Sequence, residues 1–181
     1  MRVWGFVALA VDSSTPRHRT GCDGPAIPSG IDGFAALHYL ATRPFVLPDR
    51  VAVPGSSLGG IAALGNVENN ALEPDQHLKF HAAVAFYPSC TGDSGQVDVP
   101  ALILIGDKDD WAWAQAGRDM VADATRHGAA IDLVVYPDAT HDFDVPATTP
   151  YRILGHHIAY DAAATQDAEQ RVRDFLGRAL R

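Results

Sequence analysis

The chain of 181 residues has few cysteines, no excess of basic residues and no long apolar run. It carries 14 Lys and Arg residues against 22 Asp and Glu residues, a formal net charge of −8. We therefore expect no binding to nucleic acid or to an anionic membrane, because both require a basic surface. No apolar run approaches the roughly 18 residues that a membrane-spanning helix needs, which argues against an integral membrane protein.

The two cysteines, Cys22 and Cys90, fit no zinc or redox spacing. Both follow expected strands, so two buried thiols and a single disulfide both remain open. The adjacent pair His156 and His157 also makes a poor metal site, because neighbouring side chains point apart on regular structure and no further ligand completes the set. We expect no metal and no cofactor.

Hydrophobic residues make up 47% of the chain and charged residues 20%, which is typical of one globular domain spanning residues 1–181. The start, MRVWGFVALAVDSS, resembles a signal peptide, but Asp12 and a turn-rich stretch stand where a cleavage site would be. A buried parallel strand over Val3–Val11 explains the segment better. We expect a cytoplasmic protein, with a periplasmic or secreted one left open if the true N-terminus lies upstream.

Apolar strand-like runs alternate with helical patterns along the chain, and this alternation predicts an α/β fold with three layers and a mostly parallel sheet. Ser29 and Asp161 are the expected caps of the first and last helices. The expected strands are Val3–Val11, Arg50–Val53, Ala82–Phe86, Ala101–Ile105 and Ile131–Tyr136, and the expected helices are Ile31–Thr42, Leu58–Leu64, Ala112–His127 and Ala162–Leu180, with a long loop over residues 137–160.

A serine, a carboxylate and a histidine follow three of these strands, at the edge where parallel sheets place functional residues. The stretch from Gly55 to Gly59 satisfies the pattern G-x-S-x-G, and only Ser57 fits its register. Such a pattern is typical of a sharp strand-to-helix bend that lifts a nucleophilic hydroxyl out of the sheet. The N–H of Leu58, at the helix N-terminus, would then stabilise developing negative charge.

His141, in YPDATHDF, is the expected general base for this serine. Asp107, Asp109 and Asp110 compete as the carboxylate that orients it. Asp109 is favoured because the third residue after Gly106 is well placed to reach a histidine behind the next strand.

Several aromatic residues also follow strand ends. Tyr87 and Trp111 are the candidates for the wall of a substrate pocket, and Trp113 and Phe143 share the pattern, although aromatic residues in a core are commoner. Arg17 could meet a substrate carboxylate, but a surface arginine is the simpler interpretation.

In order and spacing, the segments GFVALAVDSSTPR, VAVPGSSLGG, AAVAFYPSC, ALILIGDKDDW and VVYPDATHDFD resemble the dienelactone hydrolase family of the α/β-hydrolase superfamily. The resemblance implies that Ser57, Asp109 and His141 are nucleophile, acid and base. The enzymes that give the family its name have cysteine where this chain has Ser57. Full-length relatives also begin with further strands, one of which carries a second oxyanion donor and lies between the segments matching Val3–Val11 and Arg50–Val53.

The resemblance therefore predicts an N-terminally truncated α/β-hydrolase-like domain that cleaves small esters or lactones through an acyl-enzyme. Val3–Val11 must then pair directly with Arg50–Val53, leave a gap, or take a strand from elsewhere. Two alternatives stay open: a catalytically impaired or inactive ligand-binding domain, and a peptidase-like hydrolase. The expected partner is a small-molecule ester or lactone, and an exposed sheet edge would favour a homodimer.

Overall fold

The structure is a computed structural model that describes residues 4–19, 29–68, 78–91 and 95–181. Within these residues the main sheet has four parallel strands, and their order across the sheet follows their order in the chain. They are β1 (Ala52–Ser56), β2 (Ala82–Phe86), β3 (Ala101–Gly106) and β4 (Ile131–Tyr136). The helices are α1 (Ser29–Ala41), α2 (Leu58–Gly65), α3 (Ala114–Arg126) and α4 (Ala162–Ala179), preceded by a 3-10 turn over Thr15–Arg17.

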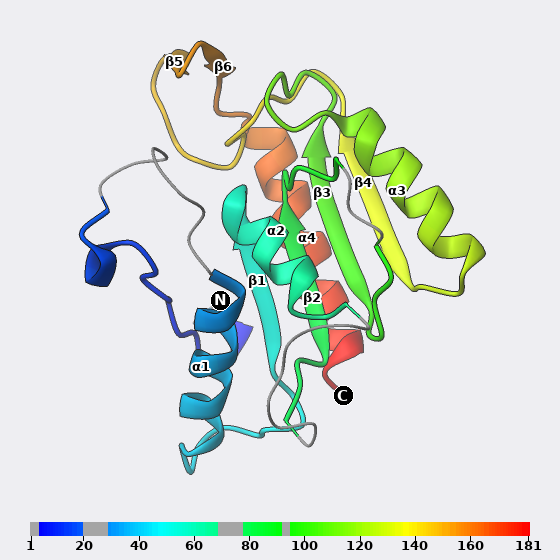
Figure 1. Cartoon of the computed structure of the whole chain (residues 1–181). Coiled ribbons are helices and arrows are strands. Elements are labelled where there is room, and N and C mark those ends of the chain that lie inside the picture. The colour runs from blue at the N-terminus through cyan, green and yellow to red at the C-terminus, as the bar shows by residue number, and fades with distance from the viewer. Residues whose placement is uncertain (1–3, 20–28, 69–77, 92–94) are drawn as a thin grey trace.

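Helices cover both faces of the sheet, which confirms the predicted three-layer α/β fold (Figure 1). Successive side chains of β3 point to opposite faces of the sheet, as in any β-strand. Leu102 and Leu104 pack with α4, whereas Ala101 and Ile103 pack with α1, α2 and α3. All of these strand residues are at least 97% buried, so β3 is the centre of the core.

Most predicted elements are confirmed, and β2 and β4 have the expected bounds. β1 and β3 continue further than expected, to Ser56 and Gly106, so the sheet reaches the residues that carry the chemistry. Asp161 caps α4 as predicted, because its carboxylate accepts hydrogen bonds from the N–H groups of Ala163 and Ala164. Ser29, the other expected cap, is instead the first residue of α1.

The predicted strand Val3–Val11 is wrong over its described residues, which contain no strand from Trp4 onward. Trp4 and Phe6 pack against the core on the α4 side, while Val7, at 60% exposed, and Val11, at 48%, face solvent. A cavity of about 740 Å³, lined by residues 5–11 and by residues of β1, separates this segment from the sheet. Of the three expected arrangements, the described residues show the gap, because residues 5–11 pair with none of the described strands.

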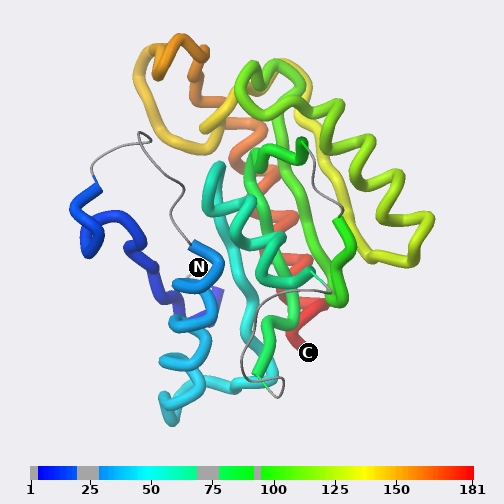
Figure 2. The backbone as a smooth tube through the Cα atoms, in the orientation of Figure 1, coloured from blue at the N-terminus to red at the C-terminus, as the bar shows by residue number. Residues whose placement is uncertain are grey.

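The long loop predicted over residues 137–160 contains an antiparallel hairpin that sequence reasoning missed. Its strands are β5 (Tyr151–Ile153) and β6 (His156–Ile158), and Leu154 and Gly155 make the turn with positive φ angles. Strands of three residues are too short to show an alternating pattern. Figure 2 shows the hairpin beyond the carboxyl ends of the main strands, next to the loop that follows β3.

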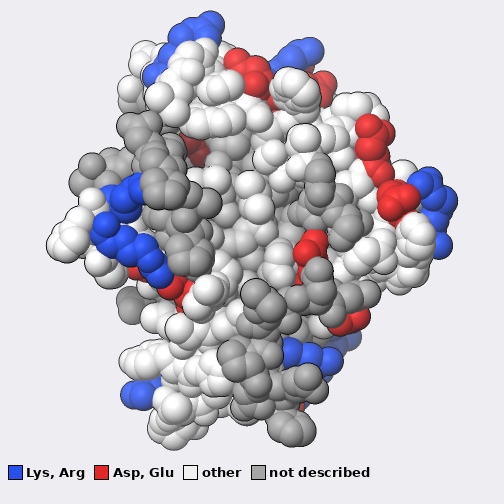
Figure 3. All heavy atoms as spheres, in the orientation of Figure 1, with Lys and Arg blue, Asp and Glu red and all other residues white. Residues whose placement is uncertain are grey.

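No helix in the described parts of the chain is both long and apolar enough to cross a bilayer. On the face shown in Figure 3, Lys and Arg atoms form separate small groups toward the outline and no continuous basic patch. Cys90 is buried, whereas Cys22 lies outside the described residues. Two thiols and a single disulfide therefore both remain open.

Candidate active site

The three predicted catalytic side chains come together at the carboxyl edge of the sheet. Ser57 follows β1 directly, Asp109 lies three residues beyond β3, and His141 lies five residues beyond β4. Because the strands are parallel, their carboxyl ends lie at the same end of the sheet. His141 therefore contacts Ser57, 84 positions earlier in the chain, and Asp109, 32 positions earlier. The fold thus supplies the convergence that the sequence implied.

The bend at Ser57 is held in an uncommon backbone conformation, with φ 52° and ψ −118°. Its N–H donates a 2.9 Å hydrogen bond to the carbonyl of Phe86 on β2, which ties the bend to the sheet. A Cβ atom on Gly55 would lie 2.0 Å from the carbonyl oxygen of Gly59, so the first turn of α2 can pack here only against glycine. A Cβ on Gly59 would meet nothing within 4 Å, whereas one on Gly60 would lie 3.0 Å from the Phe86 carbonyl oxygen, so the tightest contact is the one at Gly55.

The three side chains form a continuous hydrogen-bonded chain. His141 Nε2 lies 3.0 Å from Ser57 Oγ, and His141 Nδ1 lies 2.8 Å from Asp109 Oδ2. An ionised carboxylate only accepts hydrogen bonds, so this contact favours the tautomer with the proton on Nδ1, which leaves Nε2 to accept the serine proton. The side chains of His141 and Asp109 are 3% and 0% exposed, which shields their interaction from water.

Each of the three competing carboxylates has a distinct set of bonds. Asp109 Oδ1 accepts from the N–H groups of Trp111 and Ala112, at 2.9 and 2.7 Å, and this leaves Oδ2 aimed at His141. Asp107 accepts from the N–H of Asp138 at 2.7 Å and so joins the loops after β3 and β4. The choice of Asp109 over Asp110 agrees with this geometry.

Asp110 holds the β5–β6 hairpin. Its carboxylate lies 3.3 Å from the N–H of His157 and 3.3 Å from Nδ1 of His156. Partial burial raises the pKa of Asp110, but these hydrogen bonds outweigh it and keep the pKa below its ordinary value. The carboxylate is therefore charged at neutral pH and anchors the hairpin.

The N-terminus of α2 lies directly behind the serine. Leu58 is the first residue of this helix, and its N–H, like the others of the first turn, has no intrahelical acceptor. The helix dipole and these N–H groups favour negative charge next to Ser57. The side chain of Leu58 is 63% exposed, so only its backbone is suited to the predicted oxyanion role.

Tyr87 is buried beside the imidazole rather than open to solvent. Its ring centroid lies 4.6 Å from that of His141, and its hydroxyl donates a 2.7 Å hydrogen bond to Asp144. Burial and this bond raise the pKa of Tyr87, so the phenol stays protonated and remains a donor. At 1% exposed, the ring supports His141, and a contact with substrate stays a prediction.

Trp111 is connected to the triad twice. Its N–H donates to Asp109, and its ring centroid lies 5.1 Å from that of His141. The ring is partly exposed, as a pocket wall would require. Trp113 is 67% exposed, whereas Phe143 is fully buried among Phe86, Tyr87 and Tyr136 and belongs to the core.

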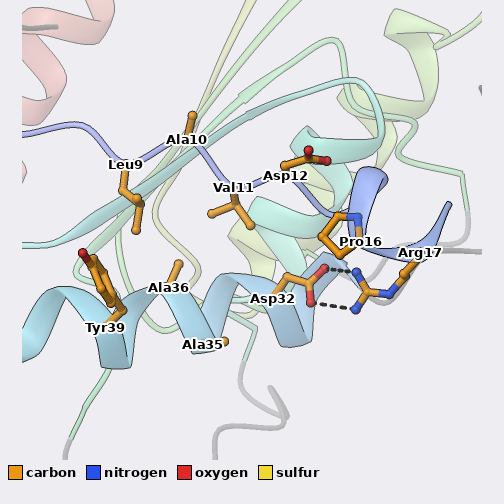
Figure 4. Close-up of a pocket in the computed structure, with 10 residues that line it drawn as sticks. All are labelled: Leu9, Ala10, Val11, Asp12, Pro16, Arg17, Asp32, Ala35, Ala36 and Tyr39. Atoms are coloured by element: carbon orange, nitrogen blue, oxygen red, sulfur yellow. Dashed lines mark hydrogen bonds and ion pairs between the residues drawn. The ribbon is translucent and has the colours of Figure 1, made fainter. Parts of the chain in front are cut away.

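Two hollows of the described surface lie away from the triad. One is the cavity beside β1; the other, about 590 Å³, lies between residues 9–17 and α1. Figure 4 shows the second, with Arg17 forming a two-pronged ion pair with Asp32 at 2.8 Å. Arg17 is therefore engaged away from the triad, in line with the simpler interpretation of it as a surface residue.

Among the described residues, no group of three or more His, Cys, Asp or Glu side chains is arranged to hold a metal ion. His156 and His157 lie on β6 and serve the hairpin. The contacts that sequence reasoning missed are those of the hairpin and of Thr140, whose hydroxyl accepts a 2.8 Å bond from the N–H of Ala159. No sequence motif marks these contacts, because they join segments whose pairing depends on the hairpin turn.

The sequence profile of the dienelactone hydrolase family matches residues 26–180. The chain belongs to the dienelactone hydrolase family. The matched region contains all three triad residues and excludes the N-terminal segment that failed to form a strand.

The chain is also similar to individual known proteins, in sequence and in fold. It is 25% identical over 175 residues to a Bradyrhizobium protein named "Probable 2-oxo-3-(5-oxofuran-2-ylidene)propanoate lactonase", a match that covers 87% of this chain and 70% of that one. The fold of this chain is similar to that of a dienelactone hydrolase-like promiscuous phosphotriesterase from metagenomic libraries. The TM-score is 0.68 at 22% identity, and the match covers 84% of this chain and 62% of that chain.

The fold is also similar to that of propionate-bound esterase 2 from Thermogutta terrifontis. The TM-score is 0.61 at 19% identity, and the match covers 82% of this chain and 64% of that chain. The chain thus spans less than two thirds of the length of these solved structures. At these identities the solved structures establish the fold alone.

Proposed function

We propose that the protein is a serine hydrolase that cleaves small carboxylic esters or lactones through an acyl-enzyme. The observation that carries the proposal is the unbroken chain of hydrogen bonds from Ser57 Oγ through His141 to Asp109. Membership in the dienelactone hydrolase family and the named lactonase relative support the same class of substrate.

In the first half of the reaction, Ser57 Oγ attacks the carbonyl carbon while its proton passes to His141 Nε2. The carbonyl oxygen becomes an oxyanion, stabilised by the N–H of Leu58 at the start of α2. Asp109 stabilises the imidazolium that forms without taking its proton. Collapse of the intermediate breaks the ester C–O bond, and the leaving alkoxide takes the proton from Nε2.

In the second half, His141 accepts a proton from water while the water oxygen attacks the acyl carbon. The second tetrahedral intermediate collapses, Ser57 Oγ leaves with the proton from Nε2, and the carboxylic acid is released. The strained backbone at Ser57 keeps the hydroxyl in place for both steps.

Steady-state hydrolysis of p-nitrophenyl acetate tests the proposal. We expect Ser57→Ala to lower kcat by at least about 10⁴-fold, since loss of a triad nucleophile has this order of effect. Ser56→Ala is the matched control, because Ser56 is the neighbouring hydroxyl on β1 and has no bond to His141 in the described contacts. Equal rates for the wild type and the Ser57→Ala variant would exclude the proposed mechanism.

A further inference from the structure

The β5–β6 hairpin reaches the catalytic histidine through a set of stacked rings. His156, on β6, stacks on Trp111 with ring centroids 4.4 Å apart and an interplanar angle of 15°. Trp111 in turn lies 5.1 Å from His141, at 33°. Trp111 thus contacts both imidazoles, one in the triad and one on the hairpin.

Both ends of this arrangement are fixed by hydrogen bonds from the same short loop. Asp110 holds His156 and the N–H of His157, whereas the preceding residue, Asp109, is held by the N–H of Trp111. The hairpin also pairs directly with the site through a bridge between His141 and Ile158. The hairpin therefore contacts the loop after β3 through Asp110 and Trp111 and stabilises its conformation.

We propose that His156 is a positioning residue: its stacking on Trp111 holds the indole against His141 and keeps the Asp109–His141 bond aligned. This inference rests on the proposed function, since it concerns the same triad. His156 is 31% exposed at its side chain, so its place is set by the stack and by Asp110 rather than by burial in the core.

The test compares four proteins: wild type, His156→Ala, His156→Phe and His157→Ala. Phenylalanine keeps a flat ring for the stack but loses the bond to Asp110. His157 precedes Ile158 on the same strand, and its side chain points to the opposite face from that of His156, so His157→Ala is the matched control. Its backbone N–H remains available to Asp110.

We expect His156→Ala to lower kcat for p-nitrophenyl acetate by about 10- to 100-fold with KM little changed, because small displacements of catalytic groups have effects of this size. His156→Phe should recover most of the loss, and His157→Ala should match the wild type. Nuclear Overhauser effects between the rings of Trp111 and His141 should disappear in His156→Ala and return in His156→Phe.

The two measurements separate this inference from the proposed function. If the wild type hydrolyses the ester and His156→Ala keeps both its kcat and its Trp111–His141 contacts, the positioning role is excluded. A loss in His156→Ala that His156→Phe does not recover would also overturn it. If the wild type has no esterase activity but the ring contacts change as expected, the positioning role stands and the proposed function fails.

Discussion

Two regions around the main sheet, the loops after β3 and β4 and the segment beside β1, differ in how firmly the chain is held. Beyond β3 and β4, the loops are joined by Asp107, Asp109, Asp110 and the hairpin, and they hold a buried histidine. Beside β1, residues 5–11 run outside the sheet, and a cavity of about 740 Å³ lies between them and β1.

Both regions are rich in strand-forming residues, so composition does not explain the difference. A strand is stable only where a neighbour accepts and donates its backbone hydrogen bonds and side chains cover its faces. β3 lies between two partners, whereas residues 5–11 have none among the described strands. Ser57 is fixed despite following the edge strand β1, because its N–H bonds to β2 and Gly55 contacts α2.

The largest expected effect is on catalysis and concerns the loop after β3. Asp109→Asn should lower kcat by about 10⁴-fold, because an amide favours the wrong tautomer of His141. Asp107→Asn should have little effect, since an asparagine oxygen can still accept from the N–H of Asp138. Ester hydrolysis by the two variants, at matched folding by circular dichroism, measures the contrast. Similar losses in both would mean that the loop as a whole, and not Asp109, carries the role.

The next effect is on the bend that fixes Ser57. Gly55→Ala forces a Cβ to within 2.0 Å of the Gly59 carbonyl and should cost about 3 kcal/mol of unfolding free energy. Gly59→Ala, with open space around its Cβ, should be neutral or slightly stabilising within the helix. Urea unfolding monitored by circular dichroism compares them. An unchanged midpoint for Gly55→Ala would show that the close packing is not required.

The contrast between strand β3 and residues 5–11 can be measured directly in the apolar side chains. Leu104→Ala removes a fully buried side chain of β3 and should cost about 2–5 kcal/mol. Leu9→Ala, at a side chain that is 42% exposed beside the cavity, should change stability by less than about 0.5 kcal/mol. Equal costs in urea unfolding would mean that residues 5–11 are packed as tightly as the core.

Much of the fold, and the positions of the three candidate triad residues at the strand ends, followed from the sequence. Buried parallel strands such as ALILI are continuous apolar runs, and Gly55, Ser57 and Gly59 mark the bend by their spacing. Asp109 was favoured by its position after Gly106 and by the family resemblance. Its carboxylate lies 2.8 Å from His141 Nδ1, and its catalytic role stays a prediction.

The remaining features depend on contacts that no local pattern reports. Val3–Val11 has a strand-like sequence, but whether it pairs depends on a neighbour elsewhere in the fold. The stack of His156 on Trp111 joins residues 45 positions apart through two short strands, too short to predict. Tyr87 was placed correctly at a strand end, yet its burial beside His141 follows only from the packing of Phe143 and Asp144.

The smallest expected effect concerns the ion pair beside the N-terminal segment. The hydrogen bond from Arg17 holds the pKa of Asp32 below its ordinary value, so the pair stabilises the fold above the unfolded-state pKa of about 4. Arg17→Gln should lower the thermal midpoint slightly at about pH 7. The difference in midpoint between wild type and variant should shrink as the pH falls below about 4 and Asp32 becomes protonated in the folded protein. A constant difference between about pH 7 and pH 2 would exclude this contribution.

Covalent labelling of the folded protein with a fluorophosphonate, followed by mass spectrometry of its peptides, tests the catalytic role of the triad most directly. We predict one adduct, on Ser57 and not on Ser56, with labelling strongly slowed in a His141→Ala variant. Absence of an adduct on Ser57 in folded protein, or equally fast labelling without the imidazole, would contradict the proposal that His141 activates Ser57 as a nucleophile.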